Sequence, residues 1–168
     1  MEKVEINKTM HLSEHFKLGE VTKSRHSEVY NIPSHVAIEN LKRVCGWLEE
    51  LRFTYNTLYC LKPGEDYETS ENVEPIVINS GYRSPELNKK VGGSPTSNHL
   101  TGCAVDIRCV GVEQAIRYAA ILLDTADDRQ EDFDELLIER NCKGRYWVHF
   151  AVRPPKEGNR RKTSFINA

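Results

Sequence analysis

The chain has 168 residues, of which 39% are hydrophobic, and a formal net charge of −2 at pH 7. This length and apolar content predict one domain over residues 1–168 and argue against two independently stable domains. The nearly balanced charge predicts no binding to nucleic acid, because no broad basic field results. No apolar run has the length of a membrane span and the first residues lack the apolar part of a signal peptide, so we expect synthesis in the cytoplasm as a soluble protein.

The five cysteines are predicted to be free thiols. Their number is odd and no Cys-x-x-Cys pair occurs, which is atypical of a disulfide framework or a thiolate zinc cluster. Cys103 and Cys109 are six residues apart on one predicted strand, roughly 20 Å at the rise of a strand, and cannot bridge. We expect the cysteines to act as small buried hydrophobic residues.

The first half of the chain predicts a framework of helices. Residues 10–21 are expected to form short helical turns. Apolar residues recur at helical spacing from Ile38 to Leu51, and Pro33–Ser34 provides a start for this core helix. Residues 62–74, with Pro63–Gly64 and several acidic residues, predict an exposed loop that belongs to the same domain.

A strand and a short helix are predicted next. Residues 75–79 have the composition of a buried strand, and Ser80 to Arg83 lead the chain off its end. Ser84 and Pro85 are a good N-cap and first position for a helix over residues 86–91. Arg83 thus lies at a strand end, where loops often carry chemistry. A structural ion pair is the alternative explanation for this arginine.

The central stretch around residues 97–109 predicts half of a metal site. Apolar and other residues alternate from Cys103 to Arg108, which places Asp106 on the face opposite the apolar side chains. Gly102 allows a sharp turn before this strand, so His99 can fold back over the same face. Imidazole nitrogen and carboxylate oxygen both suit zinc, which takes three protein ligands and a water in a catalytic site.

The remaining chain predicts a helix over residues 112–124, then two antiparallel strands over 133–139 and 145–152. The turn between the strands falls at residues 141–144. Residues 153–168 are expected to form a solvated basic tail, and contact with an anionic polymer is the alternative. We expect an α+β fold, an antiparallel-rich sheet with helices packed mainly on one side and the metal on the other.

His149 is the candidate third metal ligand, and Glu139 is the candidate general base. An imidazole inside an apolar strand needs a partner, and either a metal or a carboxylate would satisfy it. If the turn spans residues 142–144, Glu139 lies opposite Trp147 and on the face of His149. A register shifted by one residue would turn Glu139 away, and a salt bridge to Arg140 or Arg145 is its alternative role.

The chain resembles the zinc peptidases of the M15 group over residues 11–162. This group includes D-alanyl-D-alanine carboxypeptidases, dipeptidases and phage endolysin peptidases, which share a fold with the Hedgehog signalling domain. The resemblance rests on Ser80-Gly81-Tyr82-Arg83-Ser84, Gly92-Gly93, Ser97-x-His99-x-x-Gly102-x-Ala104-x-Asp106 and Trp147-Val148-His149.

The resemblance implies a site, a cofactor and a substrate. His99, Asp106 and His149 match the ligands of Zn²⁺, Arg83 matches an arginine that binds substrate and oxyanion, and Ser97 matches a supporting serine. Tyr82 and Trp147 are predicted to contact substrate. The substrate would be a peptidoglycan stem peptide, cleaved by a carboxypeptidase or an endolysin-type endopeptidase. Action on the cell wall would follow release from a phage or prophage host, for example with the help of a holin.

Two other functions stay open from the sequence. Many M15 peptidases carry a carboxylate three residues before the last histidine, where this chain has Tyr146. A non-catalytic, zinc-containing module that binds murein is therefore the main alternative. A glycosidase that uses two of Asp134, Glu135 and Glu139 is a weaker one, since it leaves His99 and Asp106 unexplained. The sequence indicates neither the scissile bond nor the oligomeric state.

Overall fold

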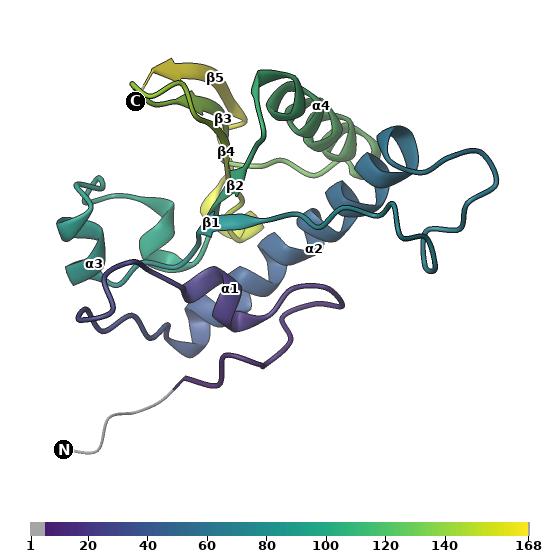
Figure 1. The fold of residues 1–168 in the computed structure, drawn as a ribbon. Coiled ribbons are helices and arrows are strands. Elements are labelled where there is room, and N and C mark those ends of the chain that lie inside the picture. Colours follow the sequence, from purple (N-terminus) through teal and green to yellow (C-terminus); the bar gives the residue numbers. More distant parts are fainter. Residues whose placement is uncertain (1–5, 168) are drawn as a thin grey trace.

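A single sheet with the strand order β1-β2-β4-β3-β5 is the centre of the computed structural model, which describes residues 6–167 (Figure 1). Its strands are β1 (Ile78–Ser80), β2 (Ala104–Arg108), β3 (Glu135–Arg140), β4 (Tyr146–Ala151) and β5 (Lys162–Asn167). Neighbouring strands from β1 to β3 pair antiparallel, and β5 pairs parallel to β3. The sheet is thus mixed and mostly antiparallel, as predicted.

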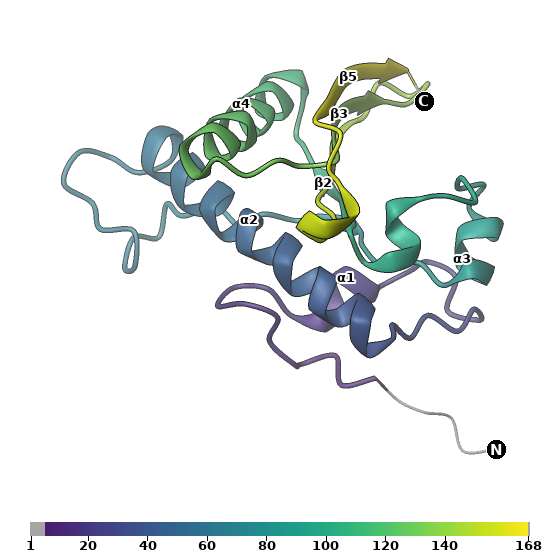
Figure 2. The same cartoon turned by 180° about the vertical axis from the view of Figure 1, so that it is seen from behind.

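Four α-helices surround this sheet within residues 6–167: α1 (Leu18–Thr22), α2 (His35–Tyr59), α3 (Pro85–Lys90) and α4 (Val112–Arg129). Figures 1 and 2 show α2 and α4 together on one side of the sheet and α3 on the other. The Ser34 side chain accepts a hydrogen bond from the backbone N–H of Ala37 and begins α2, while Ser84 does the same for α3 from Leu87. Both predicted helix starts are confirmed.

Helix α2 is longer than predicted, because it continues beyond Leu51 to Tyr59. Only Tyr55 and Asn56 are buried in its last two turns, and Asn56 makes contacts that no local pattern shows. Asn56 binds the backbone of Glu74 on both sides, since its Nδ2 donates to the carbonyl at 2.9 Å and its Oδ1 accepts from the N–H at 2.6 Å. The predicted loop over residues 62–74 follows α2 in the chain and extends away from the rest of the domain (Figure 2).

The hydrophobic core lies between the sheet and helices α2 and α4. Val105, Val148 and Phe150 alternate with the residues of the other face and are fully buried. The ring of Phe150 lies 5.4 Å from that of Trp47 in α2, centroid to centroid. Burial of each such side chain stabilises the fold by about 1.5–3 kcal/mol. The core therefore holds one sheet face rigidly and leaves the opposite face for polar residues.

The C-terminal segment corrects one prediction. Most residues from 155 to 167 are exposed, as expected of a solvated segment, but they do not form an unpaired tail, because β5 pairs with β3 from Glu135 opposite Lys162 to Arg140 opposite Asn167. The turn before β5 is fixed by Arg160, whose guanidinium binds the buried Asp134 through two hydrogen bonds of 2.8 and 2.7 Å. A strand that depends on such long-range pairing has little signal in its own sequence.

Two smaller differences concern a strand and a cysteine: the strand is shorter than predicted, and Cys142 is exposed although the cysteines were expected to be buried. The strand predicted over 75–79 forms regular pairing only from Ile78 to Ser80, where a register shift interrupts the ladder with β2. The cysteines are all free, as predicted.

No helix within residues 6–167 is both long and apolar enough to span a membrane.

Candidate metal centre

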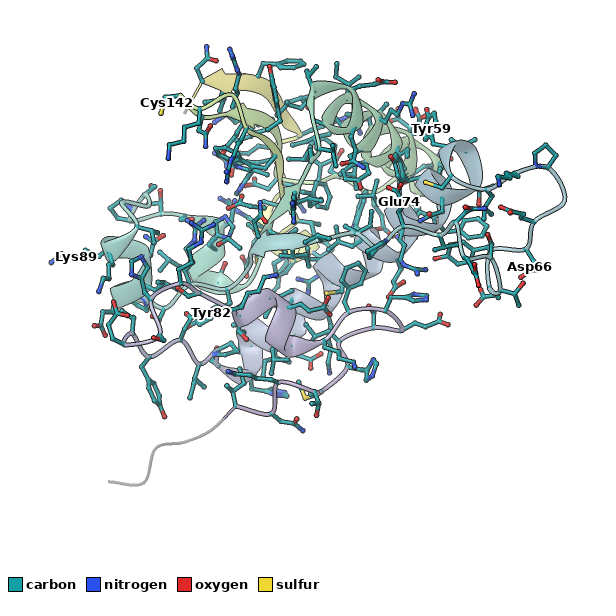
Figure 3. All side chains as sticks on the ribbon, viewed as in Figure 1. Tyr59, Asp66, Glu74, Tyr82, Lys89 and Cys142 are labelled. Atoms are coloured by element: carbon teal, nitrogen blue, oxygen red, sulfur yellow. The ribbon has the colours of Figure 1, made fainter. Side chains whose placement is uncertain are left out.

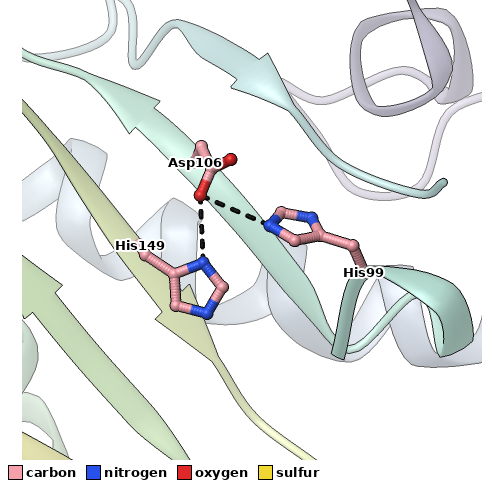
Figure 4. A group of neighbouring side chains, drawn as sticks. All are labelled: His99, Asp106 and His149. Atoms are coloured by element: carbon pink, nitrogen blue, oxygen red, sulfur yellow. Dashed lines mark hydrogen bonds and ion pairs between the residues drawn. The ribbon is translucent and has the colours of Figure 1, made fainter. Parts of the chain in front are cut away.

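His99, Asp106 and His149 meet on the open face of the sheet (Figure 4). Asp106 Oδ1 lies 3.0 Å from His149 Nδ1 and 3.4 Å from His99 Nε2. One ligand atom from each residue lies within 4.8 Å of the other two. All three side chains are buried, with less than a tenth of each residue exposed. The structure therefore brings together the three residues that the sequence predicts as metal ligands.

Local structure explains why these side chains converge. Asp106 and His149 are direct partners in the β2–β4 ladder, so their side chains leave the same face at the same level. His99 lies in a 3₁₀ turn (Asn98–Thr101) that Ser97 caps by accepting the His99 N–H at 3.3 Å. Gly102 ends this turn with φ of 74°, and an added Cβ would lie 2.4 Å from the Ala37 carbonyl oxygen. Only glycine fits this turn without strain.

Each histidine has its second ring nitrogen occupied. His99 Nδ1–H donates to the Gly81 carbonyl at 2.6 Å, which leaves Nε2 facing Asp106. His149 Nε2–H donates to Glu135 Oε2 at 3.2 Å, which leaves Nδ1 facing Asp106. Such hydrogen bonds fix the tautomer and the ring orientation of metal-binding histidines. Glu135 in this role was missed from the sequence, although its spacing from Leu137, the ladder partner of His149, places it on the same face.

The charges of the site are strongly coupled. Burial opposes ionisation of Asp106, but the neighbouring His99 and His149 together hold its pKa well below the usual range. For His149, burial disfavours the charged ring, yet hydrogen bonds to Asp106 and Glu135 raise its pKa to about 9. The centre thus keeps a permanent anion between two imidazoles, and a cation at this point would replace the proton that His149 holds at neutral pH.

The donor set fits a zinc ion. Tetrahedral zinc with ligands at 2.0–2.1 Å separates its donor atoms by about 3.3 Å. The separations from Asp106 Oδ1 to the two histidine nitrogens, 3.0 and 3.4 Å, are close to that value. Three protein ligands of this kind leave a fourth position for water or substrate, which is typical of catalytic zinc and unlike closed structural sites.

Arg83 supports the carboxylate from the side away from the histidines. Its Nη2 donates to Asp106 Oδ2 at 2.9 Å, and its Nε donates to Ser80 Oγ at 3.0 Å. The backbone N–H of Arg83 also donates to the His99 carbonyl at 3.0 Å. The ion pair that the sequence left as an alternative for Arg83 is therefore present. Within residues 6–167 its remaining guanidinium N–H groups make no hydrogen bond, so they can bind a second anion.

Glu139 occupies the position predicted for it. It lies opposite Trp147 in the β3–β4 ladder, on the face that carries His149. Burial, and after it the negative charge of Asp106, raises the pKa of Glu139 above its ordinary 4.5. The alternative of a salt bridge to Arg140 or Arg145 is wrong, because Glu139 has no ion pair among the residues that the structure describes.

The other predicted site residues lie in different environments. Ser97 caps the His99 turn, as described above. Trp147 is half-buried and lines a cleft beside the metal site. Tyr82 is 8% exposed and belongs to the hydrophobic core, so its ring has a packing role and its contact with substrate stays a prediction. Tyr146 packs against the edge of the core and lies opposite Arg140 in the ladder.

A second polar network, which the sequence did not predict, fixes the turn that contains His99 through hydrogen bonds of Asn98. Asn98 Nδ2 donates to Asp134 Oδ2 at 2.7 Å and to Glu135 Oε2 at 3.2 Å. Arg153 Nε donates to Asn98 Oδ1 at 2.9 Å, while Arg160 binds both oxygens of Asp134. Burial opposes ionisation of Asp134, but its hydrogen bonds to Arg160 and Asn98 lower its pKa to about 2. The residue before a metal ligand is thus tied to β3 and the C-terminal segment.

Two histidines and one carboxylate on an open sheet face are the ligand set of a mononuclear metalloenzyme. The sequence profile of the family Peptidase M15 matches residues 65–149, about half of the chain, and this range contains all three candidate ligands. The chain belongs to the Peptidase M15 family and is a metallopeptidase of that family. A comparison with curated proteins found no significant match.

Proposed function

We propose that this protein is a zinc peptidase that hydrolyses amide bonds in the stem peptides of peptidoglycan. The observation that carries the proposal is the buried His99–Asp106–His149 centre, within the matched family region and with a carboxylate, Glu139, on the same sheet face. Zinc held by these three residues would supply a Lewis acid and lower the pKa of a bound water to about 7.

Glu139 is the residue best suited to accept a proton from the attacking water. A general base works best when its pKa lies close to the working pH, and the environment of Glu139 raises its pKa while leaving it without an ion-pair partner. Glu135 is a poor base by comparison. The hydrogen bond from His149 lowers its pKa to about 2 despite partial burial, and Arg160 and Lys162 also lie beside it.

Arg83 would bind the substrate next to the reacting carbonyl. Its contacts with Ser80 and Asp106 hold the guanidinium in place, with 18% of the side chain exposed. A fixed arginine can stabilise an oxyanion or hold a terminal carboxylate through paired hydrogen bonds. Trp147 on the cleft wall would provide an apolar surface for the peptide, and Ser97 would act through the position of His99.

Glu135 would act as a positioning residue. Its contact with His149 Nε2 orients the ring and makes Nδ1 a better donor. Loss of such a carboxylate typically lowers metal affinity 10- to 100-fold. This role differs from that of Glu139, which acts on the reaction and has little effect on metal binding.

The structure weighs against both alternatives that the sequence left open. The side chain at position 146 packs against the core, while Glu139 supplies a carboxylate on the metal face from the neighbouring strand. A non-catalytic module is therefore not required by Tyr146. A glycosidase is disfavoured because the Asp134 side chain is fully buried and ion-paired with Arg160.

The finer parts of the proposal rest on the resemblance of the sequence. A Hedgehog-like and D,D-peptidase-like fold, action at the cell wall after release in a phage or prophage context, and the choice between carboxypeptidase and endopeptidase belong to it. Each stays a prediction.

A matched pair of variants tests the assignment of roles. Glu139→Gln should lower kcat for stem-peptide cleavage about 10²- to 10⁴-fold, with one zinc still bound. Glu135→Gln should lower zinc affinity about 10- to 100-fold and regain most activity when zinc is in excess. Competition with a zinc-binding dye measures affinity, and mass spectrometry of released fragments measures cleavage. Full activity of Glu139→Gln at saturating zinc would refute its role as the base.

A further inference from the structure

A cleft of about 1070 Å³ lies next to the metal centre, on the side of Arg83 and Trp147. Its walls come from residues 23–26, the end of β1, helix α3, the end of β2 and the β3–β4 turn. Figure 3 labels Cys142 in that turn and Lys89 in α3, two of the elements that supply these walls. The cleft is large enough for several residues of an extended peptide.

The lining of this cleft has one sign of charge. Among residues 6–167, those that line the cleft include no Asp or Glu. They do include five permanent cations, which are Lys23, Arg25, Arg83, Arg108 and Arg145. The whole chain has 25 acidic and 23 basic residues, so this separation of charge is local and is not a result of a basic composition. Walls of a single sign concentrate the field inside a cleft and attract the opposite charge.

Four of the five cations have no polar partner within residues 6–167. Arg83 binds Asp106, whereas the side chains of the other four make no ion pair or hydrogen bond with any part of the chain that the structure describes. All four are exposed. Elsewhere on the surface, Arg117, Arg129 and Arg161 each pair with a carboxylate. The cleft thus presents free guanidinium and ammonium groups to whatever enters it.

The positions of Arg108 and Arg145 in the chain determine how far a group bound by them lies from the metal centre. Arg108 follows Asp106 by two residues on the same face of β2, about 7 Å at the rise of a strand. Arg145 precedes His149 by four residues, about 13 Å along the same face. An extended peptide advances about 3.3 Å per residue. Groups bound by these arginines would therefore lie within about four residues of the reacting bond.

We propose that this basic cleft binds an acidic peptide segment, so that the enzyme selects substrates with free side-chain carboxylates within about four residues of the scissile bond. Arg108 and Arg145 are the specificity residues. Carboxylates are the anions that a peptide substrate can present here, and planar guanidinium groups bind them through paired hydrogen bonds. This inference rests on the proposed function for its substrate, but the cleft and its charges are independent of catalysis.

The test compares one stem peptide in two forms, with its side-chain carboxylates free and with the same carboxylates amidated. The C-terminal carboxylate is kept in both forms, so that binding to Arg83 is unchanged. Wild-type enzyme should show a kcat/KM about tenfold higher for the free form, mainly through KM, and the preference should shrink at high ionic strength. The double variant Arg108→Gln/Arg145→Gln should lose most of the preference, because its kcat/KM for the free form falls towards that for the amidated form.

A second double variant controls for net charge. Lys62→Gln/Lys156→Gln removes the same two charges from exposed residues outside the cleft and should keep the tenfold preference. Because the side chains of Arg108 and Arg145 make no hydrogen bond or ion pair within residues 6–167, we expect both double variants to fold like wild type by circular dichroism. Equal kcat/KM values for the two peptide forms in wild type would overturn the inference and leave the peptidase function intact.

Binding separates the two proposals if no cleavage is found. Fluorescence anisotropy with the labelled peptides measures affinity without turnover. Tighter binding of the free form by about tenfold, lost in Arg108→Gln/Arg145→Gln, would support the basic cleft although the peptidase function had failed. Equal binding of the two forms would overturn the inference in that case as well.

Discussion

Replacing Asp134 by Asn should destabilise the protein by an amount that depends on pH. Asp134 is fully buried, accepts three hydrogen bonds from Arg160 and one from Asn98, and has its pKa lowered from an ordinary 3.8 to about 2. A tenfold change in an equilibrium equals about 1.4 kcal/mol, so this fall in pKa corresponds to about 2 kcal/mol of stability at pH 7. Breaking a buried pair can cost about 3–5 kcal/mol. We expect a loss of about 2 kcal/mol for Asp134→Asn, because Arg160 is half-exposed and water can solvate it after the substitution.

The pH dependence follows from the direction of the pKa change. A carboxyl group whose folded pKa is lowered contributes its full stability above the unfolded pKa and loses it as the pH falls towards the folded pKa. For Asp134 this window runs from about pH 4 to pH 2. The difference between wild type and Asp134→Asn should therefore fall from about 2 kcal/mol at pH 7 to about half of that at pH 3.

Urea unfolding followed by circular dichroism, at pH 7 and pH 3, measures these differences. Asp132→Asn is the matched control, because Asp132 is 58% exposed and its pair with Arg161 lies at the surface. We expect that variant to lie within about 0.5 kcal/mol of wild type at both pH values. Two results would show that the buried network does not stabilise the fold as argued. One is that Asp134→Asn unfolds at the same urea concentration as wild type at pH 7. The other is that its loss of unfolding free energy is as large at pH 3 as at pH 7.

Two further predictions concern the site. Gly102→Ala should cost about 2 kcal/mol or more and weaken zinc binding, since φ is 74° and the new Cβ would meet the Ala37 carbonyl oxygen at 2.4 Å. Gly46→Ala, in α2 with no atom within 4 Å of the new Cβ, should instead stabilise by about 0.5–1 kcal/mol, and thermal unfolding compares the two. At saturating zinc, kcat should rise with pH as Glu139 loses its proton, because only the carboxylate form can accept a proton from the attacking water. If kcat of Glu139→Gln rose with pH in the same way as that of wild type, Glu139 would not be the general base.

The local pattern predicted most of the metal centre. Alternation in β2 placed Asp106 on the open face, and the β3–β4 turn set the register that brings Glu139 opposite Trp147. Gly102 indicated the turn that returns His99 to that face. These inferences succeeded because each depends on residues close in sequence, where the period of a strand or the conformation of a turn decides the outcome.

The remaining features depend on contacts between distant segments. Asp134 binds Arg160, and Glu135 binds His149, across separations that no local periodicity encodes. The segment with β5 reads as a basic tail in the sequence, since nothing local shows that β5 pairs with β3 or that Arg160, just before it, neutralises a buried carboxylate. The basic cleft was hidden for the same reason, since its cations come from four separate segments.

Bound zinc measured together with cleavage tests the central claim most directly. Purified wild-type protein, His149→Ala and Glu139→Gln would be analysed by inductively coupled plasma mass spectrometry and incubated with purified peptidoglycan. The account predicts about one zinc per chain and released stem-peptide fragments for wild type, zinc without fragments for Glu139→Gln, and neither for His149→Ala. Wild-type protein that binds no stoichiometric zinc after metal loading, or His149→Ala that still cleaves, would contradict it.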